Sequence, residues 1–216
     1  YLGAVISFLF HPGLVNTIKI LFSGSVFLSG IFMYLAAKKL WQSSTAAVVC
    51  AIMYMYLPYR IVNLYVRGSI GESIGFVLYA STFYLFLLVL STKKPLFMVL
   101  LSLSLAALIM AHNIMAVYFL PIIFIVLLAN FSWKNLSSFL FSLFSILFAF
   151  GLSNFFWLPA ILEKNLVALS QTPIANRLEN FLTISDLWTP KWGYGAPNSP
   201  DGFGLQLGWP ILVGLV

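Results

Sequence analysis

Charged residues are scarce in this chain of 216 residues: Asp, Glu, Lys and Arg together make up 7% of it, whereas 62% is hydrophobic. A soluble domain has roughly a quarter charged residues. Cysteine and histidine are also rare, with one Cys and two His. A single cysteine excludes an internal disulfide, and two histidines with no acid near them argue against a histidine metal site. The composition therefore predicts a membrane protein.

Long apolar runs follow one another along the chain. A spanning helix needs about 20 mainly apolar residues, and in lipid the backbone must satisfy its own hydrogen bonds. The runs cover Val15–Ala37, Trp41–Leu57, Ile70–Leu90, Leu96–Ala111, Ile114–Phe131 and Leu136–Leu158, with an unfinished run from Leu207. We predict an all-α fold, a polytopic transmembrane bundle with six complete spans and part of a seventh, in a single domain over 1–216. Because both ends are apolar and no Met opens the chain, we expect a fragment.

The positions of the lysines predict an orientation. Lys38, Lys39, Lys93, Lys94 and Lys134 occupy alternate turns, which must lie on one side of the membrane, and the positive-inside rule makes that side cytoplasmic. The net charge of +6 thus suits anionic lipid headgroups, and we expect the lipid bilayer as a partner and no nucleic acid. The outer side receives residues 58–69, the turn at 112–113 and an external loop at 159–206. Residues 1–10 are too few to span alone, so we expect either the tail of a span or, as the lysine topology also allows, a helix on the outer surface.

The stretch from Tyr56 to Ser73 is the most informative part of the chain. If residues after Pro58 are helical, Arg60, Asn63 and Arg67 project from one face at spacings of three and four. This pattern predicts an amphipathic interfacial helix with two guanidinium groups in a wet cavity. Arginine matches phosphate oxygens bidentately, so a phosphate or pyrophosphate is the expected ligand. The alternative is that both arginines only contact headgroups.

Ser69 and Glu72 stand at capping-box spacing before an apolar run. The cap alone would explain Glu72. An ion pair with Arg67, or a role as general base, are the alternatives, which makes Glu72 a weak candidate for catalysis.

His112 and Asn113 occupy a turn between two short apolar runs. Polar groups at membrane depth are costly unless they line a cavity or pair internally. They are therefore candidates for contact with a phosphate or hydroxyl, or simply hydrogen-bonded turn residues.

Aromatic residues gather in the polar segment before the last apolar run. Trp188, Trp192 and Tyr194 offer flat faces that pack against sugar rings, and Lys191 adds a cation nearby. The competing interpretation is an interfacial aromatic belt, which needs no ligand.

Ordered motifs across nearly the whole chain carry a resemblance. SGSVFLSGIFMYLAAKKLW, YLPYRIVNLYVRGSIGE, AHN, FFWLPAILEK and DLWTPKWGYG resemble bacterial membrane proteins named as related to 6-pyruvoyl-tetrahydropterin synthase, which in turn look like C-type glycosyltransferases. Pterin chemistry is not implied, because the synthase is a soluble zinc enzyme with a histidine cluster. The resemblance places Arg67 and Glu72 on the family's arginine and glutamate pair, His112 on its histidine turn, and Trp192, Gly193 and Gly195 on its aromatic loop.

The resemblance implies a glycosyltransferase that moves a sugar from a polyprenyl-phosphate donor to an acceptor at the extracytoplasmic face of the bacterial inner membrane. The catalytic acid would lie upstream of Tyr1, and Arg60 and Arg67 would stabilise the departing phosphate. The expected partners are the bilayer and the lipid-linked sugar. No cofactor is certain, and a divalent metal is compatible with this chemistry. A non-catalytic assembly subunit and a transporter or flippase of lipid-linked sugars remain as alternatives.

Overall fold

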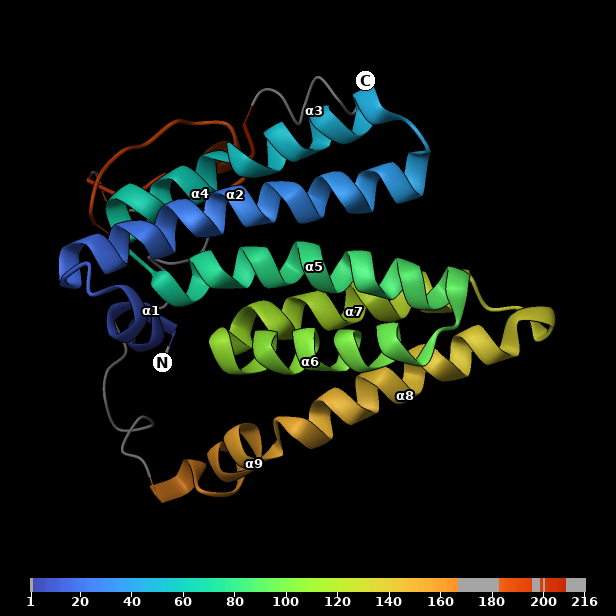
Figure 1. Cartoon of the computed structure of the whole chain (residues 1–216). Helices are drawn as coiled ribbons and strands as arrows, with labels where there is room; N and C mark the ends of the chain where they lie inside the picture. The colour runs from blue at the N-terminus through green and yellow to red at the C-terminus, as the bar shows by residue number, and fades with distance from the viewer. Residues whose placement is uncertain (1, 167–182, 196–198, 200, 209–216) are drawn as a thin grey trace.

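The computed structural model describes residues 2–166, 183–195, 199 and 201–208, and most of them form one bundle of helices (Figure 1). The helices are α1 (Leu2–Phe10), α2 (Leu14–Trp41), α3 (Ser44–Met55), α4 (Pro58–Val62), η1 (Asn63–Arg67), α5 (Ile70–Thr92), α6 (Pro95–Ala111), α7 (Asn113–Ala129), η2 (Trp133–Asn135), α8 (Leu136–Leu152), α9 (Asn154–Leu162), η3 (Lys164–Leu166) and η6 (Ile184–Leu187). Extended pairing within the described ranges is limited to isolated bridges near Trp192 and Gly195. The predicted all-α class is confirmed.

Several of these helices suit a membrane. In the part of the chain that the structure describes, four helical segments are long and apolar enough to cross one: Leu14–Trp41, Ser44–Arg67, Ile70–Thr92 and Trp133–Leu152. Helices α6 and α7 are apolar but shorter. These six segments lie where the six complete apolar runs were predicted, because a continuous helix satisfies every backbone group that lipid cannot. The number that span remains a prediction.

The bundle is held together around α5. Helix α2 packs against α3 and α5, α5 also packs against α6, and α6 packs against α8. Phe86, Leu101 and Leu105 are fully buried where α5 and α6 meet. Serines of α8 face the same interior, and Ser102 of α6 donates to the carbonyl of Ser145 at 3.0 Å. Small side chains let these helices approach closely, as is common in membrane bundles.

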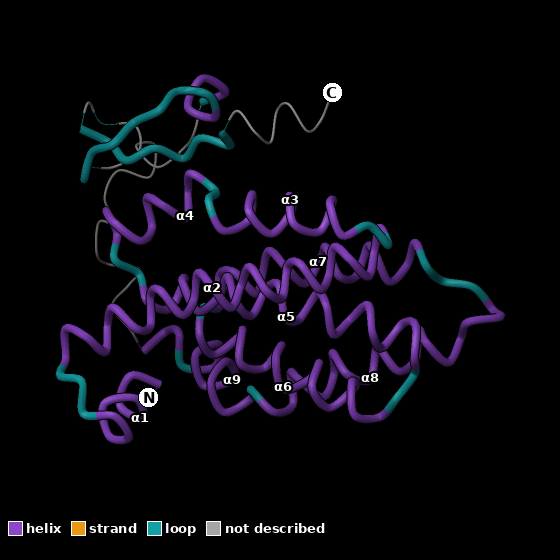
Figure 2. The backbone as a smooth tube through the Cα atoms, turned by 45° about the horizontal axis from the view of Figure 1, so that its top comes forward, coloured by secondary structure: helices purple, strands orange, loops and turns teal. Residues whose placement is uncertain are grey.

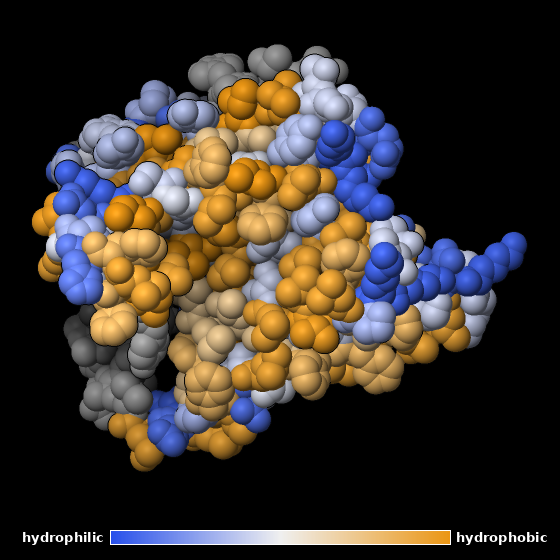
Figure 3. Space-filling model, viewed as in Figure 1, coloured by the Kyte–Doolittle hydropathy of each residue, from blue (hydrophilic) through white to orange (hydrophobic). Residues whose placement is uncertain are grey.

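The lysine turns lie at one end of the bundle. Figures 1 and 2 show the α2–α3, α5–α6 and α7–α8 connections together at the end opposite α4 and α9. Lys38 and Lys39 end α2, Lys93 follows α5 and Lys134 lies in η2. In the space-filling view, hydrophilic residues gather at this end and hydrophobic surface covers much of the helices (Figure 3). The predicted alternation is confirmed, and the cytoplasmic assignment of this end stays a prediction.

Two predicted runs have different boundaries in the structure. Trp41 belongs to α2 rather than to the next run, because Gln42 takes a left-handed conformation and Ser43 caps α3 by accepting from the amide of Ala46. The run Leu136–Leu158 is broken at Ser153, whose hydroxyl and amide both donate to the carbonyl of Ala149. A side chain that bonds to the preceding turn competes with continuation of the helix.

The segments outside the main helices agree in part with the structure predicted for them from the sequence. Residues 2–10 form α1, which packs on the start of α2, where Thr17 and Leu21 approach Gly3. The predicted external loop at 159–206 begins too early, because α9 continues to Leu162. Its described part from Thr183 lies beside α4 (Figures 1 and 2). Residues 167–182 and the run from Leu207 beyond Gly208 fall outside the described residues, and neither outer-surface assignment is tested.

Candidate functional site

The connection between α3 and α5 forms the site. Pro58 starts α4 at the first helical turn, where its missing amide hydrogen costs nothing. The helix then widens into the π turn η1, which Gly68 closes in a left-handed conformation by donating to the carbonyl of Asn63 at 2.8 Å. Single π turns recur at functional sites. Arg60, Asn63 and Arg67 all contact α5, at Phe76, Ser73 and Glu72 in turn. Arg60 and Asn63 are fully buried there, so the prediction that this face lines a wet cavity is wrong for both.

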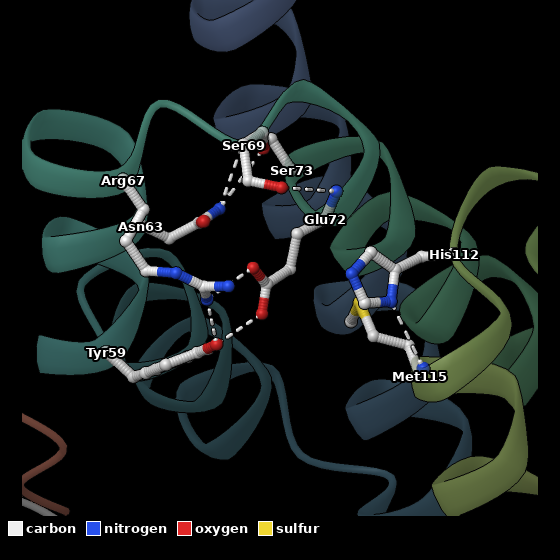
Figure 4. A network of polar contacts seen from close by, with 8 residues as sticks. All are labelled: Tyr59, Asn63, Arg67, Ser69, Glu72, Ser73, His112 and Met115. Atoms are coloured by element: carbon white, nitrogen blue, oxygen red, sulfur yellow. Dashed lines mark hydrogen bonds and ion pairs between the residues drawn. The ribbon is translucent and has the colours of Figure 1, made fainter. Parts of the chain in front are cut away.

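A compact polar cluster joins η1 to the start of α5 (Figure 4). Arg67 Nη1 lies 2.6 Å from Glu72 Oε2. The Tyr59 hydroxyl donates to Glu72 Oε1 and accepts from Arg67. The side chain of Glu72 is 6% exposed and that of Arg67 is 34% exposed. The Glu72 carboxylate is therefore buried and holds Arg67 in position, while the Arg67 guanidinium is partly exposed to solvent.

Two of the alternatives for Glu72 are realised together. Ser69 is the N-cap of α5 and accepts from the Glu72 amide at 3.4 Å. The Glu72 side chain does not complete the box by returning to Ser69, because it pairs with Arg67 and Tyr59 instead. The tertiary partners satisfy the carboxylate more fully than one backbone amide would.

Asn63 ties η1 to α5 from the buried side of the cluster. Its amide nitrogen donates to Ser73 Oγ at 3.2 Å and lies 3.4 Å from the carbonyl oxygen of Ser69. Ser73 Oγ also donates to that carbonyl at 3.0 Å. Asn63 is fully buried. The amide thus fixes the turn that carries Arg67 rather than facing a wet cavity.

The position of Arg60 differs most from the sequence prediction, which placed its guanidinium in a wet cavity. The residue is 0% exposed, and its guanidinium lies over the rings of Phe76, at 4.9 Å, and Tyr54, at 5.8 Å. None of its side-chain nitrogens has a hydrogen-bond partner among the described residues. Aromatic faces attract a cation but do not replace hydrogen bonds. A group expected in a wet cavity is therefore buried against α5.

His112 lies beside the cluster, at the turn between α6 and α7 (Figure 4). Its Nδ1 accepts from the amide of Met115 at 3.2 Å and caps α7. A Cβ added at Gly71 would meet the carbonyl oxygen of Ala111 at 2.9 Å, so glycine allows this turn to approach α5. Asn113 is exposed, and its Oδ1 accepts from the amide of Ile114. Both residues therefore hydrogen-bond within the turn, as one of the alternatives predicted.

The outer segment, residues 183–208, has its own polar anchor. Asp186 accepts from Thr183 and pairs with Lys191 Nζ at 2.8 Å. The Lys191 ammonium, followed by the Thr183 hydroxyl and amide, holds the pKa of the Asp186 carboxyl well below its usual range. The Lys191 ammonium, which the sequence placed near the aromatic residues, therefore has a carboxylate partner.

Glycine makes the rest of the outer segment compact. Gly193 donates to the carbonyl of Gly202 at 3.1 Å, and Gly195 donates to that of Asp201 at 2.6 Å. A Cβ at Gly193 would overlap the Asp201 backbone. Three aromatic side chains stay on the surface: Trp188 is 42% exposed, Trp192 57% and Tyr194 73%.

The structure brings this segment to the cluster across more than a hundred residues of chain. The Arg67 guanidinium lies 5.7 Å from the ring centre of Phe203. A groove of about 360 Å³ between α4 and the outer segment is lined by Tyr59, Leu187 and Leu205, among others. Sequence reasoning missed Tyr59 and Phe203. The run YLPYR placed Tyr59 beside the first arginine, but no pattern pointed to Phe203.

No group of three metal-ligating side chains occurs in the described parts of the chain. The fold and the cluster together define a helical membrane protein whose paired charges gather at one end of the bundle. The family of the 6-pyruvoyl-tetrahydropterin synthase related domain, a membrane protein, matches residues 1–214. The chain therefore belongs to this family, as its motifs predicted. No curated protein and no solved structure matches the chain.

Proposed function

We propose that the protein is a membrane glycosyltransferase that moves a sugar from a polyprenyl-phosphate donor to an acceptor at the end of the bundle opposite the lysine turns. The observation that carries this proposal is the position of Arg67. Its partly exposed guanidinium contacts Glu72 on one side and Phe203 of the aromatic outer segment on the other. This position supports the proposal because a guanidinium can bind phosphate bidentately and the outer segment carries exposed aromatic residues that can pack against a sugar.

The chemistry assigns a role to each part of the cluster. The acceptor hydroxyl attacks the anomeric carbon of the sugar, its proton passes to a base, and the bond to the lipid phosphate breaks with the electron pair on phosphate. Arg67 stabilises that developing charge, as a fixed guanidinium does for a leaving phosphate. Glu72 and Tyr59 hold Arg67 in place and do not touch the reacting atoms.

The base is assigned to a residue outside the cluster. Both carboxylate oxygens of Glu72 are occupied, one by Tyr59 and the other by Arg67. This arrangement supports a positioning role for Glu72 over the general-base alternative. It agrees with an acid supplied from before Tyr1, as the resemblance to C-type glycosyltransferases implies.

The test is release of polyprenyl phosphate from labelled lipid-phosphate sugars by the purified full-length protein. We expect release by the wild type, loss of at least a hundredfold in Arg67→Ala, and partial activity in Arg67→Lys, which keeps the charge but not the bidentate geometry. Lys134→Ala, at the opposite end, is the matched control and should retain activity. Thermal unfolding of each variant separates lost chemistry from lost folding.

Two other results would each overturn the proposal. If no donor is turned over while lipid binding is unchanged in Arg67→Ala, the protein is a non-catalytic assembly subunit. If labelled lipid crosses vesicle membranes with its phosphate–sugar bond intact, the protein is a transporter or flippase.

A further inference from the structure

A second cation faces a different surface of the bundle. Lys19 lies in the second turn of α2 and borders a groove of about 500 Å³ between α2 and the α4–η1 segment. The α2 wall includes Phe22 and Phe27, and the opposite wall includes Ile61, Leu64 and Tyr65. This volume lies within the range of small-molecule sites. Apolar residues make up most of the lining, and Lys19 is its one charged residue.

Lys19 has no counter-charge within the described part of the chain. The two ion pairs found there join Arg67 to Glu72 and Lys191 to Asp186, and no side-chain hydrogen bond from Lys19 is present. The lysine is exposed. An ammonium beside apolar surface at a membrane boundary favours an anion from its surroundings.

The length of α2 gives the depth of this lysine. A helix of 28 residues is about 42 Å long, close to the whole thickness of a bilayer with its headgroups, of which the hydrocarbon takes about 30 Å. Lys19 is five residues beyond Leu14, about 7.5 Å along the axis from the start of α2. With α2 spanning the bilayer along its whole length, this position falls at the boundary between headgroups and hydrocarbon. Phe27, eight residues further, lies about 12 Å deeper.

The groove therefore has the polarity of an amphiphile. Its cation stands at headgroup depth and its apolar walls continue into the hydrocarbon layer. Phe27 and Tyr65 are 64% and 72% exposed, so the groove opens toward the surrounding lipid. We propose that it binds an anionic phospholipid of the bilayer, with the phosphate at Lys19 and one acyl chain between α2 and the α4–η1 segment. This inference does not depend on the proposed transferase activity.

A lipid bound in this groove would also stabilise the α4–η1 segment that carries Arg67. Ile61 and Leu64 flank Asn63, which fixes the turn that carries Arg67. A chain packed against this wall would oppose outward movement of α4 and η1. Binding to the native state alone raises stability by mass action.

Lipid binding should be measured with the full-length protein in detergent, by native mass spectrometry and by thermal unfolding. Phosphatidylglycerol is the anionic probe, and phosphatidylcholine of the same chain length is the neutral one. We expect tighter binding of the anionic lipid and a larger rise in Tm. Lys19→Gln should lower affinity for phosphatidylglycerol about fivefold, the factor expected for one lysine near an anionic surface. Lys93→Gln, at the other end, should not.

The competing occupants give different results. Equal binding of both lipids, or no loss in Lys19→Gln, would overturn the role of Lys19. Displacement by inorganic phosphate alone would show a free-anion site. Saturable binding of a single-chain polyprenyl phosphate, but of no diacyl lipid, would reassign the groove to the donor. Because these readouts need no turnover, they stand apart from failure of the proposed transferase.

Discussion

The two ends of the bundle carry charge in different ways. At the lysine end, Lys39, Lys93 and Lys94 have no ion-pair partner among the described residues. At the opposite end, Arg67 pairs with Glu72, and both form a hydrogen bond with the hydroxyl of Tyr59. Exposed lysines near headgroups need only water and lipid, whereas a carboxylate as buried as that of Glu72 is costly without protein partners. Lys19, beside η1, is exposed like the lysines of the other end, so the paired Arg67 and Glu72 are what distinguish this end and what the proposed function depends on.

The largest expected effect is a difference in cysteine labelling that shows which side of the membrane each end of the bundle faces. In a Cys50→Ala background, single cysteines at Lys94 and at Ile184, which is 80% exposed, mark the lysine turns and the outer segment. A membrane-impermeant maleimide should label Ile184→Cys in intact cells and label Lys94→Cys only after permeabilisation. The reverse pattern would contradict the cytoplasmic assignment of the lysine end. Labelling of both before permeabilisation would contradict a membrane between them.

The next effect should come from removing the carboxylate of the cluster. Glu72→Ala leaves Arg67 and Tyr59 without their shared acceptor, and we expect a loss of about 3 kcal/mol in the free energy of unfolding. Unfolding in mixed micelles would measure it. Glu163→Ala removes an exposed acid and should change stability by less than about 0.5 kcal/mol. Equal losses of unfolding free energy in the two variants would show that the contacts of Glu72 stabilise the fold no more than an exposed acid does.

Close packing of the His112 turn against α5 gives a smaller effect. In Gly71→Ala the added Cβ meets the carbonyl oxygen of Ala111, a backbone atom that cannot rotate away. Overpacking of this kind costs about 1–3 kcal/mol. Gly24→Ala is the matched control, since nothing lies within 4 Å of its added Cβ, and alanine should stabilise α2 by about 0.5–1 kcal/mol. A stabilising Gly71→Ala would refute the close approach.

The smallest effect is confined to the outer segment. The pKa of Asp186 is lowered by Lys191 and Thr183. Because the pKa is lower in the folded chain, the carboxylate stabilises this segment fully above about pH 4, the ordinary range of Asp, and the contribution is lost as pH falls through the folded pKa. A carboxyl NMR titration of Asp186 should show the low midpoint, and Lys191→Gln should raise it. An unmoved midpoint would remove Lys191 as the cause.

The helices and the site show how far sequence reasoning reaches. The six complete apolar runs agree with helical segments because lipid forces each apolar run to satisfy its own backbone. The breaks at Gln42 and Ser153 were not predicted, because they depend on single side chains and backbone angles that hydropathy does not register. The ion pair of Arg67 with Glu72 was one of the weighed alternatives, since five residues separate the two.

The sequence by itself determined the membrane class, the alternation of lysine turns and the segment that carries the arginines. Tertiary structure decided which arginine is buried and which is exposed, because Arg60 packs over the rings of Tyr54 and Phe76 while Arg67 pairs with Glu72 and stays partly exposed. It also decided that Phe203 lies against Arg67, a contact between segments far apart in the chain. Local pattern fixes which elements form, and long-range packing fixes which side chains meet.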